Sequence, residues 1–190
     1  GIFTGTNRTK WFETLFAAEG EGYTPLIPAL TRAGEYYKDS STTGPYGGTL
    51  TADNKQMQCR QNFSILTTDG YWNNGSTSLG NVDNTVGEDV KNAPPKTGTT
   101  NTYPEPKAPY KDEWSNTLAD VAMHYWKSDL RTDMDNLVPT SSANPAFWQH
   151  MVTFGVSIGL KGTLDPEKDM AALIAGNKSR AGPHSGGEGT

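Results

Sequence analysis

An oxygen-rich group of side chains follows a short apolar segment, and it is the part of this sequence best suited to hold a cation. Asp69 comes directly after the segment 63–68, in which Thr67 and Thr68 are the last two residues. Carboxylate and hydroxyl oxygens suit a hard cation such as Mg²⁺, which accepts a few protein ligands and keeps several water molecules. Ligands of open α/β sheets gather beyond the carboxyl ends of strands, so Asp69 is a candidate cation ligand. The alternative is that the Asp-Gly pair only turns the chain.

The residue types that most often carry out catalysis form no recognisable pattern. The histidines, His124, His150 and His184, have no partner at the spacing of metal ligands, and Cys59 is the single cysteine. One cysteine excludes an internal disulfide and a thiolate zinc cluster. A Cys-His nucleophilic pair stays open as an alternative, although nothing in the sequence brings the two residues together. We therefore expect a protein that is not an enzyme.

Length and composition indicate one domain whose core is diluted by polar loops. The chain has 190 residues, a hydrophobic fraction of 34% and a net charge of −5. A domain of this length buries roughly 70% of the surface of its unfolded chain. Lysine and arginine are scattered singly, so the charge pattern that attracts nucleic acid is missing, and no apolar run is long enough to span a bilayer. We expect no nucleic-acid partner and no membrane-spanning segment.

Two helices are expected before Asp69. The segment 9–18 has apolar residues at helical spacing and is followed by glycines, which favour a helix end. Thr24 and Pro25 then form a start signal for a second helix that runs to about Tyr37. A threonine hydroxyl can cap a helix, and proline is tolerated at the first helical position.

Two strands are expected, over 63–68 and 151–160. The second is a nearly continuous apolar run, which is typical of a central strand covered on both faces, and it should neighbour the first strand. Further helices are predicted over 116–130, with Ser115 as the cap, and over 167–174. The alternation of helices and strands favours a parallel sheet in an α/β domain. Two strands are too few for a stable doubly wound sheet, so we expect that the chain lacks part of its domain.

The segment 70–114 is predicted to be an insertion. It consists mainly of Asn, Gly, Thr and Pro and has hardly any aliphatic residues. It is also far longer than the roughly 12 to 15 residues that are common for loops within compact domains. We expect the domain to span residues 1–176 including this insertion, and residues 177–190 to be a flexible or truncated tail.

Two sets of motifs resemble known families. Thr24-Pro25-Leu26 at a helix start, followed by Ile65-Leu66-Thr67-Thr68-Asp69-Gly70, is similar to the second and third motifs of a von Willebrand factor A domain with a metal-ion-dependent adhesion site. Longer motifs, in chain order, resemble the PilY family of type IV pilus tip proteins: Cys59-Arg60-Gln61, Asp69-Gly70-Tyr71-Trp72-Asn73, Ser115–Ala122 and Trp148–Val156. The resemblance covers residues from about Asn7 to Gly176.

The resemblance implies an incomplete von Willebrand factor A-like, Rossmann-like parallel sheet flanked by helices. It also implies an adhesion and pilus-assembly module that lies outside the cell, at the pilus tip or on the bacterial outer surface. Its ligand would bind through a divalent cation (Mg²⁺, Mn²⁺ or Ca²⁺), with Thr24 and Asp69 as metal ligands. The implied partners are minor pilins, the pilus machinery and a host or surface ligand.

The sequence departs from the resembled family in two respects. The first motif of the adhesion site, Asp-x-Ser-x-Ser, is expected ahead of the helix 9–18 and is not in this sequence, and the β-propeller of the family is missing. The segment 39–43 imitates the first motif, but it follows a helix, so we interpret it as a decoy. We therefore expect this chain alone to bind a cation weakly or not at all. The alternative function is a structural scaffold with a vestigial metal site, in which the insertion 70–114 makes the partner contacts.

Overall fold

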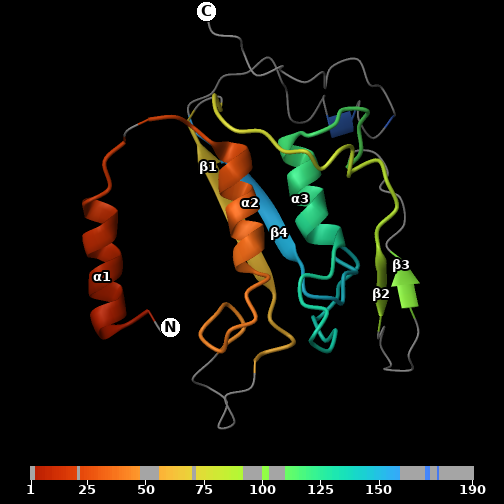
Figure 1. The fold of residues 1–190 in the computed structure, drawn as a ribbon, viewed down its shortest axis with the longest axis horizontal. Helices are drawn as coiled ribbons and strands as arrows, with labels where there is room; N and C mark the ends of the chain where they lie inside the picture. Colours follow the sequence, from red (N-terminus) through yellow and green to blue (C-terminus); the bar gives the residue numbers. More distant parts are fainter. Residues whose placement is uncertain are drawn as a thin grey trace, which may run out of the picture.

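Two parallel strands with two helices packed on one of their faces form the centre of the molecule (Figure 1). The computed structural model describes residues 3–20, 22–47, 56–69, 72–91, 100–102, 110–158, 170–171 and 175. Within these residues the elements are, in chain order, α1 (Gly5–Phe16), α2 (Leu26–Tyr36), β1 (Asn62–Thr68), β2 (Asp89–Lys91), β3 (Thr100–Thr102), α3 (Leu118–Lys127) and β4 (Met151–Ser157).

The strands β1 and β4 lie side by side and run in the same direction. Their register pairs Asn62 with Met151 at one end and Thr68 with Ser157 at the other. Parallel neighbours need a crossover connection, and α3 lies within it. The predicted α/β arrangement, with these two strands as parallel neighbours, is therefore confirmed. The larger sheet of a von Willebrand factor A-like domain is not found among the described residues, so that finer assignment stays a prediction.

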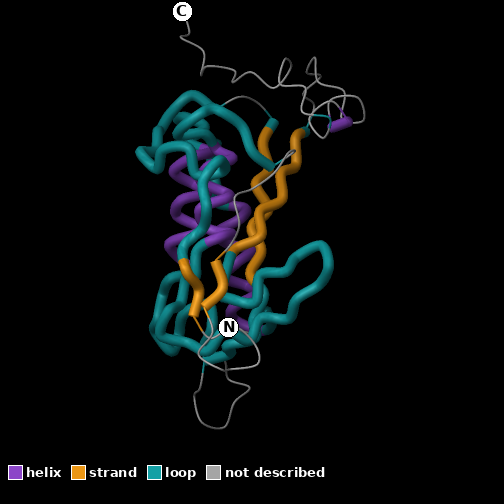
Figure 2. Tube along the Cα trace, turned by 90° about the vertical axis from the view of Figure 1, so that its right-hand side faces the viewer, coloured by secondary structure: helices purple, strands orange, loops and turns teal. Residues whose placement is uncertain are grey.

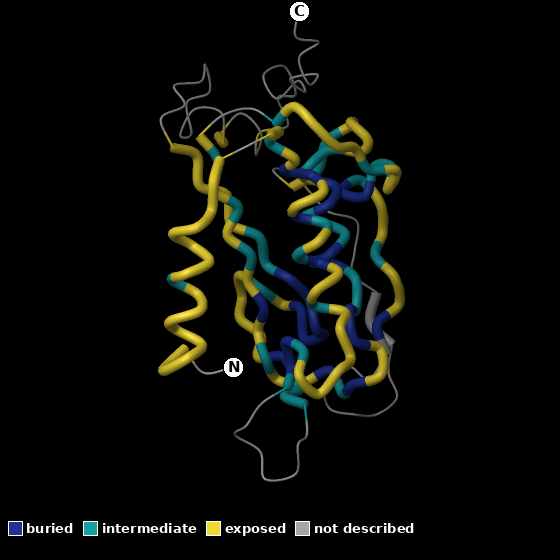
Figure 3. Tube along the Cα trace, turned by 60° about the vertical axis from the view of Figure 1, so that its left-hand side comes forward, coloured by how far each residue is buried: buried dark blue, intermediate teal, exposed yellow. Residues whose placement is uncertain are grey.

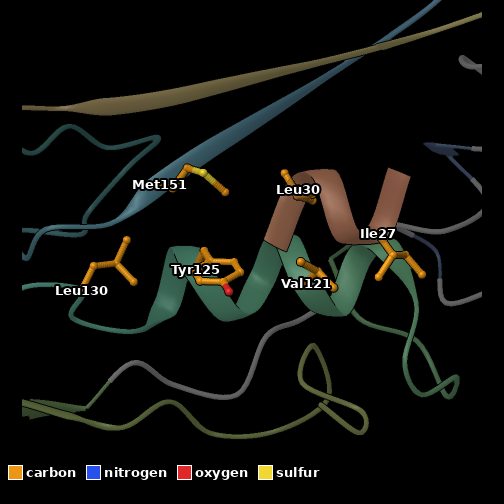
Figure 4. Packing of buried hydrophobic residues seen from close by; sticks show 6 residues of the cluster. All are labelled: Ile27, Leu30, Val121, Tyr125, Leu130 and Met151. Carbon is orange, nitrogen blue, oxygen red and sulfur yellow. The ribbon is translucent and has the colours of Figure 1, made fainter. Parts of the chain in front are cut away.

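Helices α2 and α3 cover the same face of this sheet (Figure 2). α2 contacts β1, α3 contacts β4, and the two helices contact each other. Apolar residues at helical spacing point into the space between them, and each contributes about 1.5–3 kcal/mol when fully buried. Figure 4 shows the resulting cluster, which consists of Ile27, Leu30, Val121, Tyr125, Leu130 and Met151.

The two helices approach each other closely at Gly34. A Cβ atom at this position would stand 2.3 Å from a carbon of the Tyr125 ring, so only glycine fits. Beside this contact the Tyr125 hydroxyl donates a hydrogen bond to Glu35 at 2.8 Å, and Lys38 forms an ion pair with the same carboxylate at 2.7 Å. Packing and a polar bridge thus join α2 to α3.

The opposite face of the sheet, which we call the outer face, is exposed. It carries the alternate side chains of both strands, including Phe63 and Ile65 of β1 and Phe154 and Val156 of β4. The prediction that the second strand is covered on both faces is therefore wrong for the described part of the chain. A continuous apolar run shows that both faces are suited to burial, but the cover itself has to come from other elements.

The first helix lies apart from the rest of the fold. Figures 1 and 3 show α1 as an exposed helix beside β1, and none of its residues is buried. It spans Gly5–Phe16, whereas 9–18 was predicted, and its cap residue makes no side-chain hydrogen bond. α2 also lacks a side-chain cap: its N-cap is Pro25, so Thr24 lies outside the helix and does not cap it as predicted.

The insertion 70–114 is partly built into the core, contrary to the prediction of a loop almost without aliphatic residues. β2 and β3 form an antiparallel pair. Val82 and Val90 are buried, and Val90 packs with Phe147 and Trp148 in a second apolar cluster. Most of the predicted helix 167–174 and all of the tail 177–190 lie outside the described residues.

Candidate functional site

The carboxyl ends of the two parallel strands meet at one edge of the sheet, which we call the carboxyl edge. The backbone N–H of Ile158 donates a hydrogen bond to the carbonyl of Thr68 at 2.8 Å, so the two strands end side by side. Asp69 follows β1 at this edge and is exposed. The position is the one predicted from the sequence, immediately beyond the strand end.

The start of α2 lies at the same edge. The backbone N–H of Thr24 donates a hydrogen bond to the Asn73 side-chain oxygen at 2.8 Å, which ties the residue before α2 to the segment after β1. The structure therefore brings Thr24 close to the segment that continues from Asp69, although the two are far apart in sequence. Sequence reasoning assigned no role to Asn73, and its place within the resembled motif 69–73 is the signal that was available.

The fit of a divalent cation to the carboxyl edge is partial. Thr24 offers one hydroxyl and Asp69 one carboxylate, and the hydroxyls of Thr68 and Ser157 end the two strands. A divalent cation of this kind takes six or more oxygen ligands, some of them water. Among the described residues, no group of three or more His, Cys, Asp or Glu side chains is placed to hold a metal ion. These residues do not complete a cation site, and metal ligation by Thr24 and Asp69 stays a prediction.

The segment 39–43 forms a turn after α2, at the opposite end of that helix from Thr24. The Asp39 carboxylate accepts a hydrogen bond from the backbone N–H of Ser41 at 2.8 Å, and the hydrogen bonds with Ser41 lower the pKa of Asp39. Its oxygens therefore serve the local turn, which agrees with its interpretation as a decoy.

Two of the histidines, His150 and His124, are engaged by neighbouring residues within the fold. His150 is 2% exposed, its Nδ1 lies 2.6 Å from the Trp148 carbonyl, and its Nε2 lies 2.9 Å from the Asn144 amide nitrogen. Burial lowers its pKa, and these partners suit a neutral ring that donates from Nδ1 and accepts at Nε2. Both nitrogens are thus engaged, which leaves neither as a base for the exposed Cys59.

His124 packs against the Tyr125 ring, and burial lowers its pKa. His184 lies outside the described residues.

A second polar group, which sequence reasoning missed, holds the insertion on α3. Thr117 caps α3 in place of the predicted Ser115, because Thr117 and Asp120 form a reciprocal capping box. Asp120 is 0% exposed and also accepts a hydrogen bond from the backbone N–H of Val82 at 2.6 Å. The Thr-x-x-Asp spacing is a known helix-start signal and was available in the sequence.

Lys127, the last residue of α3, binds the same loop. Its ammonium donates to the carbonyls of Val82 at 2.5 Å and Thr85 at 2.9 Å, and to the Thr85 hydroxyl at 2.8 Å. Burial lowers the pKa of Lys127, while the nearby carboxylates Asp83 and Asp120 favour its charged form. We call Asp120, Lys127 and the loop 82–85 the insertion root.

Asp83 is a buried carboxylate within the insertion root. It accepts a hydrogen bond from the backbone N–H of Asp112 at 3.2 Å, which joins the loop 82–85 to the last residues of the insertion. Burial raises its pKa to about 6, and the neighbouring carboxylates of Asp112 and Asp120 act in the same direction. The segment between Asp83 and Asp112 therefore begins and ends at one place in the fold.

Comparison with known proteins relates this chain to pilus proteins. No protein-family model matches the chain, and no solved structure matches it. Three curated relatives, from different strains of Pseudomonas aeruginosa, are named type IV pilus biogenesis factor PilY1. The PAK protein is 39% identical over 92% of this chain, and the UCBPP-PA14 protein is 33% identical over 85%.

The chain spans only 16% of the length of the PAK protein. No helix among the described residues has the length and apolar character needed to cross a membrane. Over most of its length, this chain is thus similar to one segment of the PilY1 proteins, which supports its assignment to the PilY family.

Proposed function

We propose that this chain is a non-enzymatic adhesion and assembly module of a type IV pilus tip protein on the bacterial outer surface. The observation that carries the proposal is the 39% identity, over 92% of this chain, to proteins named type IV pilus biogenesis factor PilY1. Its partners are minor pilins, the pilus machinery, and a host or surface ligand.

The ligand contact of this module lies at the carboxyl edge and uses a divalent cation held in part by Thr24 and Asp69. Two features support this placement. The hydrogen bond from Thr24 to Asn73 brings the start of α2 to the segment after β1. The Asp69 carboxylate is exposed and has no hydrogen bond or ion pair with another described residue, so its oxygens are available to a cation.

The assembly role is tested in Pseudomonas aeruginosa PilY1 that carries this chain in place of its matching segment. We expect surface pili to form, whereas PilY1 from which the segment has been deleted should form few or none. Immunoblotting checks that both proteins are present in equal amounts. Loss of pili in the exchanged protein to the level of the deletion would contradict the proposal.

The cation contact is tested separately by titrating Mg²⁺, Mn²⁺ and Ca²⁺ into this chain by calorimetry. We expect Asp69→Ala to weaken or abolish whatever binding the chain shows. Asp39→Ala, which removes an exposed carboxylate at the far end of α2, is the matched control and should leave binding unchanged. Identical curves for the chain and Asp69→Ala would remove Asp69 from the site.

A scaffold function with a vestigial metal site is the second candidate, and the insertion root favours it. Because the root holds the loop 82–85 next to Asp112, the part of the insertion between them begins and ends at one fixed place. Deleting 70–114 is a poor test, since it also removes the buried Val82 and Val90. Replacing only residues 92–99 by a Gly-Ser linker of equal length avoids this. Loss of pili after this replacement would favour the scaffold function, provided that the Asp69→Ala variant still forms pili normally.

A further inference from the structure

The outer face of the sheet is an apolar surface open to solvent. Ile65 is 69% exposed, and the rings of Phe63 and Phe154 stack on each other with their centres 6.2 Å apart. Val156 and Ile158 extend the same surface toward the carboxyl edge. Parallel sheets are usually covered on both faces, and a contiguous exposed apolar surface marks a contact.

Helix α1 carries a second unpartnered apolar surface. Trp11, Phe12, Leu15 and Phe16 recur at helical spacing along one side, and Phe16 is 81% exposed. Phe12 and Phe16 stack with their ring centres 5.8 Å apart, and Phe3 packs edge-on against Trp11. A helix of this length without a side-chain cap is only marginally stable alone in water, so α1 needs a surface to pack on.

The dimensions of the two surfaces agree. α1 is about 18 Å long at 1.5 Å per residue, and the seven-residue strands are about 23 Å long at 3.3 Å per residue. Residues 17–23 connect α1 to Thr24, which Asn73 holds at the carboxyl edge. This linker reaches about 24 Å when extended, enough to swing α1 from its position beside β1 (Figure 1) across the sheet.

We infer that the aromatic side of α1 docks on the outer face of β1 and β4 and forms the third layer of the fold. In the structure, α1 and the outer face are apart and both exposed, and we call this the open arrangement. In the docked arrangement the end of α1 lies near the carboxyl edge, because the linker holds it there. A short tether gives α1 a local concentration in the millimolar range, which favours it over α1 of a second copy.

Disulfide trapping tests the docked arrangement in the full chain. In a Cys59→Ser background we pair Leu15→Cys on α1 with Thr67→Cys, an exposed outer-face residue near the carboxyl edge. The control pairs Leu15→Cys with Arg32→Cys, an exposed residue of α2 on the other side of the sheet. We expect mild oxidation to cross-link the first pair within the monomer at least tenfold faster than the control pair. Equal rates, or cross-linked dimers only, would overturn the inference.

Thermal melting provides a second, independent measurement. Phe16→Asp places a charge on the aromatic side of α1, whereas Thr14→Asp adds the same charge at an exposed position on the polar side. If α1 docks, Phe16→Asp lowers the Tm by several degrees and Thr14→Asp leaves it nearly unchanged. If α1 stays free in solution, both substitutions are solvent-exposed, and equal Tm values would contradict docking.

Discussion

The insertion root and the carboxyl edge both gather polar side chains, yet their atoms are used in opposite ways. At the root, the Asp120 carboxylate and the Lys127 ammonium are buried and bind backbone groups of the loop 82–85. At the carboxyl edge, Asp69 is exposed and bonds to no other described residue. A buried polar group whose bonds are satisfied within the chain stabilises the fold, whereas an exposed oxygen is available to a ligand. The comparison therefore separates a structural cluster from a binding candidate.

The largest expected effect comes from Asp120→Ala. This change leaves the backbone N–H groups of Val82 and Thr117 without their acceptor in a buried site and removes half of the capping box. We expect the free energy of unfolding to fall by about 3 kcal/mol. Chemical denaturation measures it, and a loss below about 1 kcal/mol would show that the root is not a structural cluster.

Lys127→Met tests the positive side of the same root. Methionine keeps most of the apolar stem but leaves the carbonyls of Val82 and Thr85 without their donor. The expected loss is about 2 kcal/mol in the free energy of unfolding. Hydrogen exchange adds a local readout, since amides of the loop 82–85 should exchange faster while those of α2 stay protected. Uniform faster exchange would instead indicate general destabilisation.

Asp83 makes the stability of the root depend on pH. Burial raises the pKa of Asp83 in the folded chain to about 6, above its ordinary value of 3.8, so folding favours the protonated form. This contribution is present at low pH and is lost as the pH rises through about 6. We expect the stability of the chain relative to Asp83→Asn to fall by about 1 kcal/mol between pH 5 and pH 7. A pH-independent difference would contradict the buried setting of Asp83.

Asp69→Ala should have the smallest effect on stability, because its carboxylate makes no bond to another described residue. We expect the free energy of unfolding to stay within about 0.5 kcal/mol of the unchanged chain. Thermal melting without divalent cations checks this value. A loss similar to that of Asp120→Ala would remove the distinction between the two regions and make Asp69 a structural residue.

Local sequence patterns predicted the parts of the fold that depend on neighbouring residues. The apolar segments that became β1 and β4 were predicted as parallel neighbours, and Asp69 was placed correctly beyond a strand end. The cap of α3 was predicted at Ser115, although Thr117 and Asp120 carried a stronger signal two residues later. That error was avoidable, since the capping box is a local pattern.

Other features depend on contacts between distant segments, and no local pattern reports them. The burial of Val82 and Val90 follows from how the insertion folds against α3 and Trp148. In the sequence, Gly34 is only a residue that weakens a helix. The structure shows that the Tyr125 ring packs against it, so that a side chain would not fit there.

The sequence by itself predicted the segments that form α2, α3, β1 and β4, because alternation and helical spacing act over a few residues. Only the tertiary structure decided that the outer face of β1 and β4 is exposed, and that Thr24 meets the segment after Asp69 through Asn73. The physical reason is that side-chain type sets the suitability of a surface for burial. Which surface or ligand meets it depends on where the chain places its other elements.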